Sequence, residues 1–285
     1  MKAKAQEKNR NLLLRAGTAM VLLPAVLWLV WKGELPFALL ISVAAAACAF
    51  ELNQLPLQGP EHGGAPISGA VIASTGAAFL LPLLHHAPLG FLSVEIVLVV
   101  LVAAACIDAL FFEPEVALVP RRVGLAVLGA VYGGLMLSAL VKLRQLEHGA
   151  VWIFLALAVT WANDTGGYFA GRAFGKHKLY PRISPSKTVE GALGGMAFSV
   201  LWGLGVFKWG LPDVPLWGGA VIGLGASILG PLGDLSESAM KRAYGAKDSG
   251  KLLPGHGGML DRLDALLFTA PFVLLCARWL LAGVR

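Results

Sequence analysis

Residues 91–112 read FLSVEIVLVVLVAAACIDALFF, an apolar run that contains only two carboxylates, Glu95 and Asp108. A transmembrane α-helix needs about 20 predominantly apolar residues, so this run predicts a membrane span. Eight further apolar stretches lie at roughly 13–31, 35–50, 67–84, 122–141, 149–170, 188–207, 214–233 and 264–282. We therefore expect an all-α, polytopic integral membrane protein with about nine transmembrane helices.

The composition of the whole chain agrees with this expectation. Of its 285 residues, 57% are hydrophobic and 14% are charged, and the mean hydropathy is +0.72. An ordinary soluble domain is about 25% charged. These values exclude a disordered protein, a nucleic-acid-binding domain and an ordinary cytosolic enzyme, because the apolar surplus must face lipid.

The distribution of basic residues predicts the orientation. If the N-terminus is cytoplasmic, 17 of the 23 Lys and Arg residues fall in the N-terminal segment and the cytoplasmic loops. Cytoplasmic segments of membrane proteins carry such an excess. We therefore expect an odd number of helices with the N-terminus in the cytoplasm.

Charge is scarce and concentrated. Residues 163–190 and 234–264 hold 17 of the 40 charged side chains. Within them, 171–187 and 234–263 are predicted to be long cytoplasmic loops. We expect residues 1–162 to form a scaffold with a lipid cleft, and residues 163–285 to form the catalytic region.

The first candidate block contains Asn163 and Asp164 near the cytoplasmic end of the sixth span. An ionisable group at membrane depth costs roughly 2.5–3.5 kcal/mol on insertion scales and suggests function. The start of the seventh span adds Ser184, Ser186, Lys187 and Thr188. Hydroxyls and a lysine at a helix start suit phosphate oxygens. The alternative is that Ser186 or Thr188 merely caps a helix.

The second block begins with Asp234, which follows a predicted Pro-Leu-Gly turn and is expected to open a helical stretch. Glu237 lies three residues on, so the pair also fits a variant of the capping box. Lys241 shares the face of Asp234. Asp261 and Asp264 share another helical face, where like charges repel unless a cation intervenes. A hard divalent cation is the simplest solution.

The connecting segment is rich in glycine, with Gly257 and Gly258 among four glycines near Lys247. Such backbone forms either an anion-binding nest or plain turns. His256 is either structural, or a hydrogen-bond donor or acid near a phosphate. Arg262 suits a phosphate partner. Metal-binding acids and phosphate-binding bases on one predicted side of the membrane indicate transfer chemistry on a lipid-borne phosphate.

The segment from Ser238 to Asp264 resembles the signature of phosphatidate cytidylyltransferases, also called CDP-diacylglycerol synthases. The matching positions are Ser238, Lys241, Arg242, Lys247, Asp248, His256, Gly257, Gly258, Asp261, Arg262 and Asp264. The upstream Asn163-Asp164 and the stretch SPSKTVEG at 184–191 are also similar to that family.

The resemblance implies transfer of CMP from CTP to phosphatidic acid, giving CDP-diacylglycerol and pyrophosphate, with Mg²⁺ and room for a second cation. It implies Asp234, Asp261 and Asp264 as metal ligands, and Lys241 and Arg242 as further catalytic residues. It implies substrate-binding roles for Asn163, Asp164, Ser184, Ser186, Lys187, Thr188, Lys247, Asp248, His256, Gly257, Gly258 and Arg262. It also implies a homodimer and a multi-pass protein of the bacterial inner membrane with its active site facing the cytoplasm.

Two other functions remain open at this point. A CTP-dependent polyprenol or lipid kinase would move the γ-phosphoryl group of CTP to a lipid alcohol. A cation-coupled transporter would use intramembrane aspartates as a pathway, but it predicts polar groups over both membrane halves. The clustering on one predicted side counts against the transporter.

Overall fold

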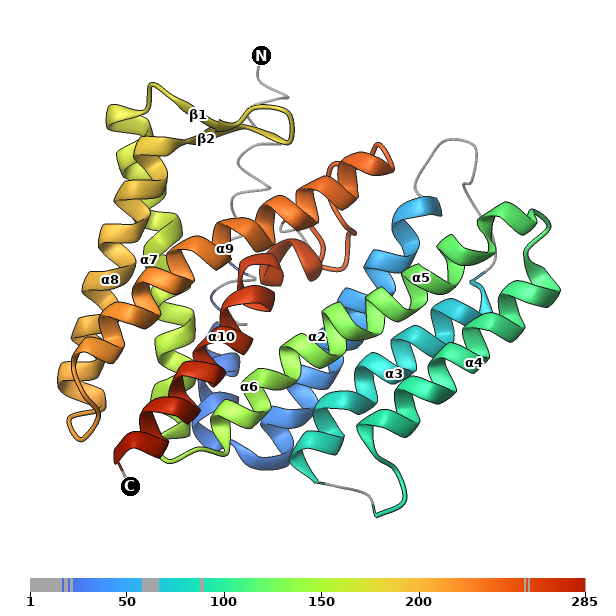
Figure 1. The fold of residues 1–285 in the computed structure, drawn as a ribbon, viewed down its shortest axis with the longest axis horizontal. Coiled ribbons are helices and arrows are strands. Elements are labelled where there is room, and N and C mark those ends of the chain that lie inside the picture. Colours follow the sequence, from blue (N-terminus) through green and yellow to red (C-terminus); the bar gives the residue numbers. More distant parts are fainter. Residues whose placement is uncertain are drawn as a thin grey trace.

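The protein is a helical bundle with one small β-hairpin (Figure 1). The computed structural model describes residues 17, 20, 23–57, 67–87, 90–253, 255 and 257–284. The predicted polytopic helical class is confirmed, because seven helical segments in this part of the chain are long and apolar enough to cross a membrane.

The elements follow one another with short connections. The first helices are Leu23–Lys32, α2 (Glu34–Gln54) with the 3₁₀ turn η1 (Leu55–Leu57), α3 (Gly69–His86) and α4 (Val94–Phe112). Next come the turn η2 (Val116–Leu118), α5 (Val119–Gly129), the π-helical segment η3 (Ala130–Leu135) and α6 (Met136–Arg144). The C-terminal elements are α7 (Gly149–Phe174), β1 (Lys178–Tyr180), β2 (Ser184–Thr188), α8 (Val189–Gly210), α9 (Trp217–Ala243) and α10 (Leu260–Val284).

Each predicted span corresponds to a helix or a run of helices. α7 has 26 residues but is not among the seven apolar segments, because Asn163, Asp164 and several glycines follow its apolar first half. Within the described residues, the predicted first span appears as Leu23–Lys32. The predicted orientation of the chain stays a prediction.

Helix α10 joins two groups of helices. α7, α8 and α9 pack together, whereas α2 to α6 form the rest of the bundle (Figure 1). α10 packs against α9 and α7 on one side and against α6 on the other. The predicted boundary at residues 162 and 163 falls inside α7.

The two predicted loops are shorter than expected. α7 continues to Phe174, and residues 178–188 form the antiparallel hairpin of β1 and β2. α9 runs without interruption through Pro231 to Ala243. The expectation that Asp234 opens a helix, and the capping-box alternative with it, are therefore wrong. Proline is tolerated inside membrane helices because neighbouring groups and local adjustments satisfy the freed backbone.

Glycines let α7 and α8 approach closely. A Cβ atom at Gly191 would lie 2.9 Å from the carbonyl oxygen of Gly167, and one at Gly195 would lie 2.7 Å from that of Asn163. Small residues at such crossings allow the backbones of membrane helices to pack directly. The GxxxG spacing of Gly191 and Gly195 thus serves this contact, which sets α8 and the preceding strand against α7.

Replacing Gly195 with alanine is expected to destabilise the protein by about 1–3 kcal/mol, the usual cost of overpacking. The added methyl would meet a backbone oxygen that cannot move aside. Gly205→Ala on the same helix is the control, since its Cβ would lie 3.5 Å from the Trp209 ring. Thermal unfolding in detergent should show a lower midpoint for Gly195→Ala alone. Equal midpoints for the two variants would contradict the packing argument.

Candidate functional site

A cluster of carboxylates lies where α9 packs against α10. Asp234 and Glu237 come from α9 and Asp264 comes from α10, and one oxygen of each lies within 4.8 Å of the others. Gly233 makes this approach possible, because a Cβ there would collide with the carbonyl oxygen of Asp264. The two helices thus bring three acids together that lie up to 30 positions apart.

Two lysines partly compensate these charges. The Lys241 Nζ lies 2.6 Å from a carboxylate oxygen of Glu237 and 2.6 Å from one of Asp261. The Lys187 Nζ lies 2.5 Å from Asp234. Burial makes the compensation necessary, since Glu237 is 1% and Lys241 8% exposed, and an unpaired charge is costly there.

The charges of the ionisable side chains in and beside this cluster do not cancel. The four carboxylates of Asp234, Glu237, Asp261 and Asp264 face the two ammonium groups of Lys187 and Lys241. When all six side chains are ionised, their formal charges sum to −2. The Oε1 atom of Glu237 is buried and has no hydrogen-bond partner among the described residues. Carboxylate oxygens are the ligands of hard divalent cations, so Asp234, Glu237 and Asp264 fit such a cation.

Asp261 has a different environment from the one expected. Its Oδ1 accepts a hydrogen bond from Lys241, and its Oδ2 accepts from the backbone N–H groups of Ser249 and Gly258, each at 2.9 Å. The structure thus places Glu237, not Asp261, in the three-acid group. The sequence signal for Glu237 is its three-residue spacing from Asp234, a spacing that also fits a capping pattern.

A pocket of about 420 Å³ lies beside the cluster and contains much of the first predicted block. Its lining residues are Asn163, Asp164, Gly167, Tyr168, Gly171, Arg172, Leu179, Ser186, Lys187, Thr188, Gly191, Ala192 and Pro231. Because Lys187 both lines this pocket and pairs with Asp234 of the acidic cluster, the two predicted blocks form one continuous site.

The β-hairpin and the start of α8 position Lys187. Thr188 does cap α8, since its hydroxyl accepts a hydrogen bond from the Gly191 N–H at 3.1 Å. The Glu190 carboxylate accepts hydrogen bonds from the backbone N–H groups of Lys176 and His177, and its Oε1 lies 2.6 Å from the His177 Nδ1. Glu190 therefore ties the residues that lead into the hairpin to the first turn of α8.

Of the remaining predicted residues, those that the structure describes do not line the pocket. Ser184 pairs with Tyr180 in the hairpin. Arg242 donates a hydrogen bond to the Ala246 carbonyl oxygen at 2.7 Å. Arg242, Lys247, Asp248 and Arg262 are exposed, whereas Gly258 is buried and Gly257 has a φ of +86°. His256 lies outside the described residues.

Ser238 and Glu51 complete the surroundings of the acids. The Ser238 hydroxyl donates to Asp234 at 3.3 Å. Glu51, on α2, is only 4% exposed and accepts hydrogen bonds from the segment that leads into α10. Sequence reasoning missed Glu51, although a lone carboxylate at the end of an apolar helix was a signal that could have found it.

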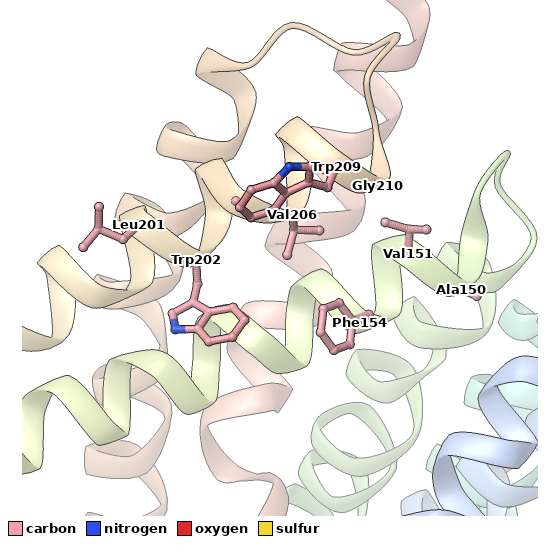
Figure 2. Close-up of a pocket in the computed structure, with 9 residues that line it drawn as sticks. Ala150, Val151, Phe154, Leu201, Trp202, Val206, Trp209 and Gly210 are labelled. Atoms are coloured by element: carbon pink, nitrogen blue, oxygen red, sulfur yellow. The ribbon is translucent and has the colours of Figure 1, made fainter.

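A second hollow, between α7 and α8, has no such chemistry (Figure 2). It has a volume of about 640 Å³. Its lining residues are Ala150, Val151, Phe154, Leu201, Trp202, Gly205, Val206, Trp209 and Gly210. None of these side chains ionises, so this hollow is suited to apolar contact and not to phosphate chemistry.

Comparison with known proteins agrees with the resemblance noted in the sequence. Residues 13–280 match the family model described as "Cytidylyltransferase family". The chain is 37% identical to the phosphatidate cytidylyltransferase of Bacillus subtilis over 254 residues, covering 87% of this chain and 90% of that protein. It is also 37% identical to the Brucella suis phosphatidate cytidylyltransferase over 267 residues, or 93% of each chain.

Lys241→Met is expected to cost about 3–5 kcal/mol of stability, because it leaves the carboxylates of Glu237 and Asp261 without their buried partner. The measurement is the thermal midpoint of the purified protein in detergent. Lys208→Met, at an exposed lysine near the end of α8, serves as the control and should keep the wild-type midpoint. An unchanged midpoint for Lys241→Met would refute its compensating role.

Proposed function

Because this chain belongs to the cytidylyltransferase family, we propose how its side chains serve the transfer of CMP from CTP to phosphatidate. The protein is an enzyme, a nucleotidyltransferase that forms CDP-diacylglycerol and pyrophosphate in phospholipid biosynthesis. One observation carries the assignment of the site: Lys187 links the polar pocket directly to the acidic cluster.

The reaction requires positioning and charge neutralisation more than covalent chemistry from the protein. An ionised oxygen of the phosphatidate phosphate attacks the α-phosphorus of CTP. The bond from that phosphorus to the bridging oxygen breaks, and pyrophosphate leaves with the electron pair. The phosphate of the acceptor is already ionised near neutral pH, so no serine or cysteine nucleophile is needed.

The acidic cluster is the proposed cation site. Its ligands would be Asp234, Glu237 and Asp264, whose oxygens already lie together. Bound Mg²⁺ supplies charge neutralisation and orientation of phosphate oxygens. Asp261, first expected as a ligand, is better suited to hold Lys241 and the adjoining backbone. The second cation stays a prediction.

The basic and hydroxyl groups bind phosphate in this proposal. Lys187 can turn from Asp234 to a substrate phosphate in the pocket, because its side chain lines the pocket and pairs with Asp234. Ser186 and Asn163, with Asp164, offer polar contacts on the same wall. The further residues proposed to attract and orient the anionic substrates are Lys241, Arg242, Lys247, Asp248, His256, Gly257, Gly258 and Arg262, with Ser184 and Thr188 from the hairpin and helix start.

The enzyme's position in the membrane follows from its two substrates. CTP arrives from water and phosphatidate from the leaflet, so the site belongs at a membrane–water interface. Because most Lys and Arg residues fall in the segments predicted to be cytoplasmic, we propose that the site faces the cytoplasm. We propose the bacterial inner membrane as its location, because the relatives are bacterial. We further propose that residues 1–162 supply the scaffold and lipid cleft, that residues 163–285 supply the catalysis, and that two copies form a homodimer.

One assay tests the function against its alternatives. Purified protein receives Mg²⁺, phosphatidate and CTP labelled at the α- or γ-phosphorus, and a lipid alcohol is tested in parallel. We expect the α-label in lipid, with pyrophosphate released. A γ-label in the lipid alcohol would instead indicate a lipid kinase. Absence of any labelled lipid would refute both the cytidylyltransferase and the lipid kinase. A transport assay would then test the cation-coupled transporter.

Asp264→Asn should lower kcat by at least about 100-fold, because the loss of one electrostatic group from a catalytic site has effects of this size. It should also weaken the binding of Mn²⁺, measured by calorimetry without substrate. Asp213→Asn is the matched control, since Asp213 lies exposed in the turn between α8 and α9. Wild-type Mn²⁺ binding by Asp264→Asn would exclude Asp264 as a ligand.

A further inference from the structure

The carboxylate of Glu51 is buried against the segment that precedes α10. Its Oε1 accepts a hydrogen bond from the Met259 N–H at 3.0 Å. Its Oε2 accepts from the Leu260 N–H and from the Ser249 hydroxyl, both at 2.9 Å. Three donors therefore converge on a side chain that lies about 200 positions earlier in the sequence.

Two of these donors stand at the start of α10. The N–H groups of a helix's first turn lack partners within the helix and carry partial positive charge. Glu51 satisfies those of Met259 and Leu260 from outside, so a residue of α2 caps the helix that carries Asp261 and Asp264. Glu51 thus links α2 to the start of the helix that contributes to the candidate site.

A second carboxylate, that of Asp261, also accepts hydrogen bonds from the segment that precedes α10. Asp261 accepts from the N–H groups of Ser249 and Gly258, while the Ser249 hydroxyl donates to Glu51. Two glycines accommodate this arrangement. A Cβ at Gly258 would collide with the Ser249 hydroxyl and with the Glu51 carboxylate, and one at Gly250 would lie 2.5 Å from Glu51.

We propose that Glu51 is a positioning residue for CMP transfer. It fixes Ser249, Met259 and Leu260 against α2 and thereby sets where Asp261 and Asp264 lie relative to α9. The kinetic part of this inference rests on the proposed function. The structural part does not, because the hydrogen bonds of Glu51 involve no substrate.

The test compares Glu51→Gln with the wild type and with Asp108→Asn. The glutamine keeps the shape but replaces one acceptor oxygen with a donor group. Asp108 is the matched control, because it is also a buried carboxylate of the N-terminal half, 7% exposed and paired with Arg122 at 2.7 Å. It lies on α4, which packs against α3 and α5.

Hydrogen exchange without substrate is the first measurement. We expect the amides of Gly258, Met259 and Leu260 to exchange at least about tenfold faster in Glu51→Gln. They should keep their wild-type rates in Asp108→Asn. Unchanged exchange in Glu51→Gln would overturn the proposal, and so would equal acceleration in both variants.

Steady-state kinetics with varied Mg²⁺ is the second measurement. We expect Glu51→Gln to lower kcat, or raise the half-activating Mg²⁺ concentration, by about tenfold or more, the range seen for outer partners of metal ligands. The KM for CTP should change less. Asp108→Asn should leave both values near wild type, and a similar Mg²⁺ shift in this control would overturn the positioning role.

Ser249→Ala keeps the proposal falsifiable if Glu51→Gln does not fold. It removes one donor to Glu51, so the same amides should exchange faster, by a smaller factor, and the Mg²⁺ requirement should rise in the same direction. No change in either quantity would contradict the proposal. A wild-type enzyme that transfers no CMP would refute the proposed function alone, since the exchange experiment would still decide the role of Glu51 in holding this segment.

Discussion

Carboxylates crowd together at the junction of α9 and α10, and their mutual repulsion is the constraint on which the site depends. Asp234, Glu237 and Asp264 bring oxygens within 4.8 Å, which stays tolerable only if opposite charges lie close by. Lys241 and Lys187 provide part of that charge from two directions. The remaining negative charge is the reason why we propose a cation site here.

These carboxylates and lysines meet only because the surrounding helices pack closely and in fixed positions. Gly233 lets α10 approach α9, and the glycines of α8 let α7 approach in turn, so the hairpin before α8 brings Lys187 to Asp234. Glu51 ties the start of α10 to α2. Close backbone packing and a few buried polar contacts therefore determine the positions of side chains that come from distant parts of the chain.

Much of the architecture could be predicted from local sequence. Apolar runs of sufficient length gave the helices, and the concentration of charge in residues 163–190 and 234–264 marked the two blocks that meet in space. Helix ends were less predictable. Pro231 and Gly233 resembled a turn, but both lie inside α9, because packing against neighbouring helices stabilises a continuous helix there.

The sequence by itself determined a polytopic helical membrane protein and the residue types of a phosphate-transfer site, because hydropathy and side-chain chemistry are local properties. Only the tertiary structure decided that Glu237 joins Asp234 and Asp264 while Asp261 holds Lys241 and a backbone segment. It also brought Glu51 to the start of α10. The rotation of each helix and the contacts between distant helices depend on packing across the whole bundle, which local periodicity does not specify.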